Sequence, residues 1–381
     1  MHSIYFNEEH LMLQKMVREF AENEIKPLAQ SIDEKGTFPQ ESINKMAELG
    51  LMGIPWEDKY GGNNMDTLSL VIAIEEIGKV CASTAATMMA HTSLGTAPIA
   101  LFGTEKQKEK YLPKLATGEM IGAFGLTEPS AGSDAGNTQT TAQVSDASFI
   151  VNGQKAFCTN AGVAGIIIFT ARLIDESGKD HGIGAFITDK NTDGLKLGKP
   201  EKKMGWKGSD TRSVFFENMK IPKENILGSP SKGFKQFLQT LVGGRITIGA
   251  LSLGTAQGAY QLAINYSKER EAFGKKINRF QAVSFKLADM TTSIEAAKHL
   301  VYHAAWLKDQ GLPIIKEAAM AKLFASETAM KVCTEAIQIH GGYGYIKEYD
   351  VERFFRDAKI LEIGEGTSEI QRIIISRSIL N

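Results

Sequence analysis

Hydrophobic residues recur at helical spacing through the first third of the chain. Asn7 precedes one such stripe and is placed to cap a helix that we expect to end near Pro27. Asp66 is placed to cap a second helix, and Thr104 begins a sequence typical of a capping box. The stretch 82–101 is nearly free of charged residues, so we expect a buried helix there. This part of the chain is therefore predicted to be α-helical.

From about residue 120 the pattern changes to the alternation of short strands. Thr138–Val144 alternates in this way, and Ser145-Asp146 suits a turn. Phe149–Val151 leads into Asn152-Gly153, a pair that predicts a hairpin turn. Further β-rich runs are 165–172, 182–188 and 213–217. Short strands separated by turn residues predict a small antiparallel sandwich or barrel.

Helical spacing returns after Gly228, in the segments 232–269, 280–308 and 313–340 and in a final helix from Thr367. Long helices joined by short loops predict antiparallel neighbours in a bundle. Five glycines between positions 243 and 258 indicate close approach of another backbone or a ligand. We therefore predict an α+β chain with an α-helical N-terminal domain, a middle β-sandwich or barrel and a C-terminal four-helix bundle. The expected boundaries are 1–119, 120–228 and 229–381.

The composition narrows the class of protein. The 381 residues carry a formal net charge of −1, which gives no long-range field to attract nucleic acid or an anionic membrane. Three widely spaced cysteines exclude a disulfide framework and a CxxC metal site. No secretory signal is evident, and no apolar run is long enough to cross a membrane. We expect a soluble cytoplasmic protein that binds neither nucleic acid nor membranes.

The common signatures of nucleotide, metal and hydrolase sites are missing. The sequence has no GxGxxG after a strand, no P-loop and no GxSxG elbow. His299 and His303 are four residues apart on a predicted helix, but no HExxH pattern surrounds them. We therefore expect no metal site.

Four other segments stand out: 124–134, 157–160, 338–345 and 362–372. The first begins as a strand and opens into a loop of small hydroxyl residues, which can present donors to a phosphate or a flavin edge. The second is a strand end, and the third is a helix that ends in glycines. Taken singly, these three segments also have plain explanations as a turn, a strand end and a helix cap.

Glu365 in the fourth segment lies between Gly364 and Gly366, just before a capped helix. Glycines remove side-chain bulk, so that a substrate carbon can approach within proton-transfer distance of the carboxylate. A plain turn followed by a capping box is the alternative for this segment alone.

Together and in this order, these segments resemble the acyl-CoA dehydrogenase family over nearly the whole chain. The most specific parts are TEPSAGSDAG at Thr127–Gly136, Arg270 and Gln281 in KEREAFGKKINRFQ, QIHGGYGY, and EGTSEIQR. The family fold is an α-helical domain, a β domain and a helical bundle, in the order predicted above from the residue pattern.

The resemblance implies FAD as cofactor and assigns roles residue by residue. The expected FAD contacts within one subunit are Phe124, Leu126, Thr127, Ser133, Phe157, Cys158, Thr159, Thr367, Ser368 and Glu369. The expected contacts to the FAD of a neighbouring subunit are Arg270, Gln281, Gln338, Ile339, His340, Gly341 and Gly342, and Phe273 is a further expected FAD contact. The expected acyl-CoA contacts are Ser133, Val242, Gly243, Gly244, Arg245 and Gly366. These assignments imply a homo-oligomer, for which a tetramer is expected.

The resemblance also implies a reaction. Glu365 matches the catalytic base, which takes the α-proton of the thioester while the β-hydrogen leaves as hydride to flavin N5. A desolvated Glu between glycines should have a raised pKa, as suits a base that works near neutrality. An electron-transferring flavoprotein is the implied electron acceptor.

Two positions depart from the usual family pattern: Gly364 replaces a Tyr, and Val242 replaces an Asp. Both departures affect which substrate is expected more than which class of reaction is expected. Gly243-Gly244-Arg245 resembles the butyryl-type enzymes, so short straight-chain substrates are expected.

Three alternatives remain at this point: an acyl-CoA oxidase, a flavin monooxygenase on the same fold, and a non-catalytic acyl-CoA-binding protein. The short chain favours the dehydrogenase over the oxidase, and the presence of Glu365 argues against the other two.

Overall fold

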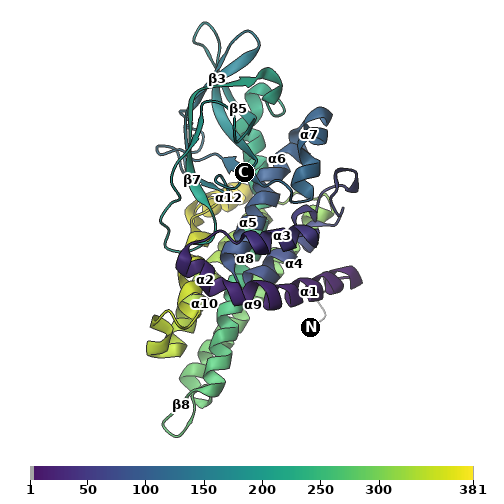
Figure 1. Ribbon diagram of the computed structural model, residues 1–381. Coiled ribbons are helices and arrows are strands. Elements are labelled where there is room, and N and C mark those ends of the chain that lie inside the picture. The colour runs from purple at the N-terminus through teal and green to yellow at the C-terminus, as the bar shows by residue number, and fades with distance from the viewer. Residues whose placement is uncertain (1–3, 381) are drawn as a thin grey trace.

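The computed structural model describes residues 4–380, and it has a helical part, then a sheet, then a helical part again (Figure 1). The predicted fold class is confirmed. The N-terminal helices are α1 (Glu8–Phe20), α2 (Lys26–Lys35), α3 (Gln40–Glu48), α4 (Thr67–Gly78), α5 (Ala82–Ala90), α6 (Ala97–Phe102) and α7 (Glu105–Ala116). The predicted caps form: Asn7, Asp66 and Thr104 accept hydrogen bonds from the first turns of α1, α4 and α7.

The predicted helix end at Pro27 is wrong, because the chain stays helical through α2. A π-helical segment, Ala21–Ile25, precedes the proline, which sits in the first turn of α2. The same happens in the buried stretch 82–101, where the π-helical segment His91–Thr96 precedes Pro98. A proline lacks an N–H and crowds the carbonyl four residues earlier, and the wider π turn relieves both conflicts.

The middle part is one seven-stranded sheet in which the pairing runs β1-β4-β2-β3-β7-β6. Strand β4 pairs along one edge with β1 and then β2, and along its other edge with β5. Its strands are β1 (Gly122–Gly125), β2 (Thr141–Val144), β3 (Ser148–Thr159), β4 (Ile166–Ile174), β5 (Asp180–Asp189), β6 (Leu195–Leu197) and β7 (Thr211–Pro222). Most pairings are antiparallel as predicted, but β1 and β2 both pair with β4 in parallel.

The predicted hairpin turn at Asn152-Gly153 is wrong. Strand β3 runs through both residues, and the pairing with β7 shifts register between Val151 and Gly153. Gly153 has φ 139°, so its conformational freedom is used in a β-bulge and not in a turn. The hairpin turn lies earlier, where the Ser145 N–H donates to the Ser148 carbonyl.

The C-terminal part contains the long helices α8 (Gly233–Glu269), α9 (Gln281–Asp309) and α10 (Ile315–His340), followed by α11 (Val351–Ala358) and α12 (Ser368–Leu380). A short hairpin, β8 (Glu271–Ala272) and β9 (Lys275–Lys276), joins α8 to α9. Two glycines of α8 account for part of the cluster noted in the sequence. A β-carbon at Gly254 or Gly258 would overlap with a backbone carbonyl of the α4 region, so the helices pack backbone to backbone.

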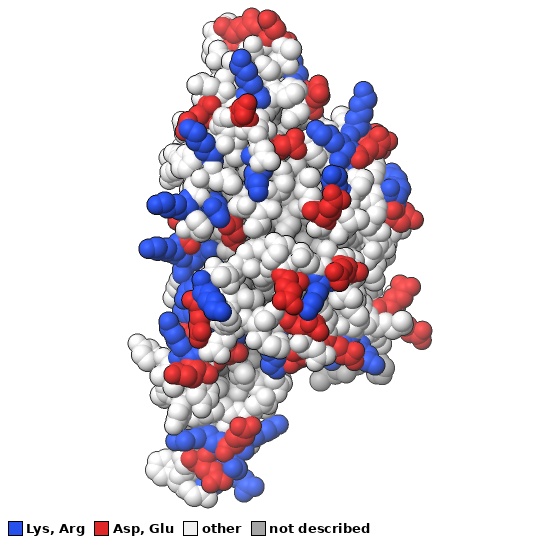
Figure 2. Space-filling model, in the orientation of Figure 1, with Lys and Arg blue, Asp and Glu red and all other residues white. Residues whose placement is uncertain are grey.

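The largest core joins the N-terminal helices to the bundle, and every residue of α4 is buried. The face shown in Figure 2 carries acidic and basic side chains interspersed. In the described part of the chain, no helix is long and apolar enough to cross a membrane.

Candidate active site

Glu365 lies in the short connection between the 3₁₀ segment Lys359–Glu362 and α12. Its backbone has φ 52°, the left-handed region that a non-glycine residue rarely adopts, and Gly366 follows with φ 97°. Local strain of this kind persists only where the surroundings hold it, and it is common at functional sites. The two glycines beside Glu365 thus belong to a tightly shaped turn.

The carboxylate of Glu365 is buried without a partner. Both Oε1 and Oε2 are inaccessible to solvent and accept no hydrogen bond from the described residues. Burial therefore raises the pKa of Glu365 to about 7, although the positive charges of Arg245 and Lys322 lower it. This is the range in which a general base works best near neutral pH.

Helix α8 forms one wall of this site. A β-carbon at Gly244 would overlap with Glu365 Oε2, and it would lie 3.4 Å from a methyl carbon of Leu94. The next residue, Arg245, is buried, and its Nε has no partner among the described residues. Two unpaired polar groups and a raised pKa in one place indicate a ligand site.

Two residues of the predicted acyl-CoA segment 242–245, Gly244 and Arg245, are therefore brought to Glu365. Val242 packs against the core, and the position of a β-carbon on Gly243 is 3.5 Å from Lys308 Nζ. Ser133, in contrast, lies exposed in the loop after β1.

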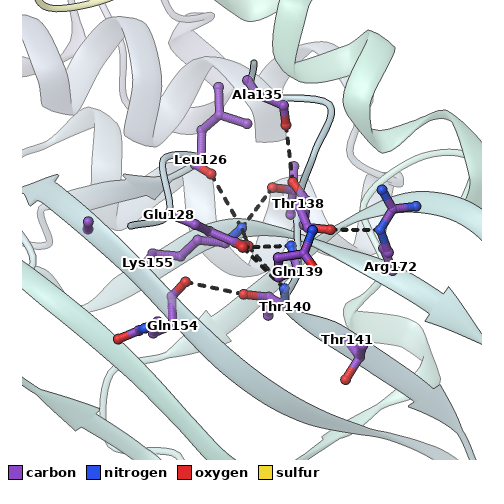
Figure 3. A network of polar contacts seen from close by, with 12 residues as sticks. Leu126, Glu128, Ala135, Thr138, Gln139, Thr140, Thr141, Gln154, Lys155 and Arg172 are labelled. Atoms are coloured by element: carbon purple, nitrogen blue, oxygen red, sulfur yellow. Dashed lines mark hydrogen bonds and ion pairs between the residues drawn. The ribbon is translucent and has the colours of Figure 1, made fainter. Parts of the chain in front are cut away.

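Two of the three segments that supply the first group of expected FAD residues, the loop after β1 and the end of β3, are tied together. The Ala156 N–H on β3 donates to the Thr127 carbonyl, 2.8 Å away. Figure 3 shows the network beneath them, centred on the buried side chains of Glu128 and Lys155. Lys155 Nζ contacts Glu128 Oε1 at 2.6 Å and also donates to the Leu126 carbonyl at 3.4 Å. The Glu128 carboxylate in turn accepts from the backbone of Gln139 and Thr140.

Phe157 protrudes at the end of the same strand. Its φ is 55° and its side chain is 66% exposed, in a stretch where the β3–β7 register shifts. A strained backbone that presents an aromatic ring to solvent fits a flat ligand lying over it. Cys158 is buried and Thr159 half-buried beside it.

The residues of EGTSEIQR lie at the start of α12. Thr367 caps this helix by accepting from the Ile370 N–H, and Glu369 is exposed. Ser368 Oγ and Gln371 Oε1 are buried without partners among the described residues.

The second group of expected FAD residues lies elsewhere on the chain. A pocket of about 450 Å³ between the ends of α8 and α10 is lined by Arg270, Ile339, His340, Gly341 and Gly342, among others. Phe273 is 95% exposed at the tip of the β8–β9 hairpin, which Figure 1 shows at the end of the molecule opposite the sheet. Gln281 and Gln338 are also exposed. One chain therefore does not bring the two groups together.

Three family models match the chain in succession. They describe the N-terminal, middle and C-terminal domains of acyl-CoA dehydrogenases and cover residues 7–119, 123–219 and 231–380. The chain belongs to the acyl-CoA dehydrogenase family. Its members are FAD-dependent oxidoreductases, as is this enzyme.

Individual relatives resemble this acyl-CoA dehydrogenase along its full length. The short-chain-specific acyl-CoA dehydrogenase of Clostridium acetobutylicum is 50% identical, over 97% of this chain and 98% of its own. Butyryl-CoA dehydrogenase from Megasphaera elsdenii superposes with a TM-score of 0.96 at 45% identity, with all of both chains covered. A chain solved in work on the electron-transferring flavoprotein of Acidaminococcus fermentans has the same TM-score at 48% identity, again with all of both chains covered.

Two features of the site were not predicted from the sequence. Lys322 is wholly buried on α10, and its Nζ donates to the Gly366 carbonyl at 2.8 Å. The only sequence feature that could have indicated a buried lysine is its position within AAMAKLFAS, a run of small and apolar residues. The Glu128–Lys155 pair was also missed, because its two residues are 27 positions apart.

Proposed function

We propose that this chain converts acyl-CoA thioesters to trans-2-enoyl-CoA, with Glu365 as the base that removes the α-proton. The observation that carries the proposal is the buried, unpartnered Glu365 carboxylate, whose pKa burial raises to about 7. A carboxylate without competing partners is free to accept a proton from carbon.

The α C–H of a thioester is only weakly acidic, so negative charge on the thioester oxygen has to be stabilised. Among the described residues, no backbone carbonyl accepts from the Glu365 N–H. This N–H is therefore available as a donor to the thioester oxygen while the side chain takes the proton. Arg245, buried on α8, adds positive charge to the same space. Bound FAD supplies the acceptor for the hydrogen that leaves the β-carbon.

The chain's own residues fit the cofactor. The exposed Phe157 ring is a group that a ligand with a flat ring would cover, and Ser368 Oγ at the start of α12 is buried without a partner among the described residues. We propose that Thr127 and Thr159 hydrogen-bond the flavin ring and that Thr367–Glu369 also contact FAD.

We propose that the residues lining the α8–α10 pocket meet the FAD of a neighbouring subunit. Within one chain, these residues lie apart from the expected FAD residues in the loop after β1 and at the end of β3, which supports this assignment. A homotetramer is the expected assembly.

Short straight-chain acyl-CoAs are the proposed substrates, and an electron-transferring flavoprotein is the proposed electron acceptor. The relatives named for short-chain and butyryl-CoA substrates support the first proposal. The structural neighbour from work on an electron-transferring flavoprotein supports the second.

An anaerobic panel of acyl-CoAs of four to sixteen carbons, scored by bleaching of the flavin, tests this function. We expect bleaching to be fastest with the shortest straight chains. Absence of bleaching with every member would contradict a dehydrogenase, and faster bleaching with the longest chains would contradict the substrate class. Rapid reoxidation of the bleached enzyme by O₂ would favour the oxidase instead.

A further inference from the structure

Lys322 is a charged side chain in an apolar setting. It is 0% exposed in the middle of α10, where the adjacent buried residues are mostly alanines. Its Nζ donates to the Gly366 carbonyl at 2.8 Å, and no carboxylate in residues 4–380 lies within ion-pair distance of it. Burying a lysine without a paired carboxylate is costly, so its presence calls for a compensating role.

A second side chain converges on the same turn. Gln371 is also 0% exposed, and its Nε2 donates to the carbonyls of Glu365 at 3.3 Å and Gly366 at 2.9 Å. Three hydrogen bonds from two helices thus end on two adjacent carbonyl oxygens. These are the carbonyls of the residues with positive φ, the part of the chain that most needs to be held.

The charges around Glu365 come from two helices. Arg245 faces it from α8 and Lys322 from α10, and both lower the pKa that burial raises. Burial, helped by the Arg245 charge, lowers the pKa of Lys322 itself to about 8, whereas the negative charges of Glu365, Glu362 and Glu327 raise it. Lys322 therefore carries its charge at neutral pH, where it favours the ionised form of Glu365.

We propose that Lys322 and Gln371 are positioning residues that hold the Glu365–Gly366 turn with the Glu365 carboxylate against α8. Gln371 acts through geometry alone, whereas Lys322 acts through both geometry and charge. The inference rests on the proposed role of Glu365 as the base.

The FAD-loaded enzyme and three variants separate these effects. Lys322→Met removes the charge and the donor, Gln371→Leu removes donors without changing charge, and Lys331→Met is the control on the exposed face of α10. Each is measured by anaerobic flavin reduction with butyryl-CoA over a range of pH. The Glu365 carboxyl band is also titrated by infrared difference spectroscopy against Glu365→Gln, a readout that does not depend on turnover.

For Lys322→Met we expect reduction roughly tenfold slower at pH 7 and a midpoint of the pH profile above that of the wild type. The carboxyl titration should move in the same direction, because a cation that favours the carboxylate is gone. Gln371→Leu should slow reduction with a smaller displacement of the midpoint, and Lys331→Met should match the wild type.

The inference is overturned if Lys322→Met keeps the wild-type rate and midpoint. It is equally overturned if the rate falls only in proportion to lost FAD while the carboxyl titration stays unmoved, since that is the behaviour of a merely structural lysine. Failure of the proposed function is a separate result: the wild-type enzyme would then not be reduced by any acyl-CoA.

Discussion

The carboxylate of Glu365 lies so close to the Cα of Gly244 that a β-carbon at position 244 would overlap with Oε2. Gly244→Ala is therefore expected to displace the carboxylate from its place against α8. A misplacement of about 1 Å can cost on the order of 10²-fold in rate. We predict that flavin reduction slows by about this factor while FAD content stays near that of the wild type.

Gly243→Ala is the matched comparison for this prediction. A β-carbon there would meet only Lys308 Nζ, at 3.5 Å, which is an ordinary contact. Both substitutions add one methyl group to the same turn of α8, so helix propensity does not separate them. Because Gly243 is itself an expected acyl-CoA contact, the two rates are compared at saturating acyl-CoA. Equal losses there would show that the contact with Glu365 does not matter.

The pH dependence of flavin reduction should follow the ionisation of Glu365. Burial raises its pKa from the ordinary value to about 7, so the carboxylate needed as base forms only as the pH rises through about 7. We expect the rate to increase up to that pH and then to level off. A stopped-flow profile at saturating acyl-CoA checks this. A rate that is already level from pH 5 upward would contradict a base with a raised pKa.

The Glu128–Lys155 pair should stabilise the loop expected to hold FAD. Burial opposes ionisation of Glu128, but the Lys155 charge and the hydrogen bonds to the carboxylate lower its pKa overall, which favours the carboxylate. Burial lowers the pKa of Lys155, and the Glu128 charge opposes that shift. Lys155→Met would leave a buried carboxylate unpaired, which costs about 3–5 kcal/mol. We predict a lower melting temperature and earlier release of FAD on heating.

Lys196→Met is the control, because Lys196 forms an exposed pair with Glu217 in the same sheet. Such pairs contribute about 0–1 kcal/mol, so its melting curve should resemble that of the wild type. The double variant Glu128→Gln/Lys155→Met should recover part of the loss, since no unpaired charge remains. If Lys155→Met melts and releases FAD like Lys196→Met, the network does not hold the loop.

Local pattern predicted most of the elements. The helix expected at 232–269 is α8, Gly233–Glu269, because helical spacing continues without interruption through its glycines. The prediction at Asn152-Gly153 failed because this pair favours a turn only where the flanking strands pair with each other. Here both neighbours of the pair are bonded to β7. The helix end predicted near Pro27 failed because a π turn absorbs the proline.

The chemistry of the site was only partly accessible from sequence. The pattern around Glu365 indicated a base near glycines, but the glycine that shapes its environment, Gly244, is 121 positions away along the chain. Lys322 could not be assigned because its partner is a backbone carbonyl, which leaves no trace in residue identity. Contacts of this kind depend on tertiary packing, and neither periodicity nor a local motif encodes them.

Glu365→Gln tests the central claim most directly. The substitution keeps side-chain size but removes the carboxylate that accepts the α-proton. FAD content, melting temperature and acyl-CoA binding should stay near those of the wild type. Anaerobic flavin reduction should fall by at least the roughly 10²–10⁴-fold expected for loss of a general base, mainly in kcat. If the variant bleaches with butyryl-CoA at the wild-type rate, Glu365 is not the base.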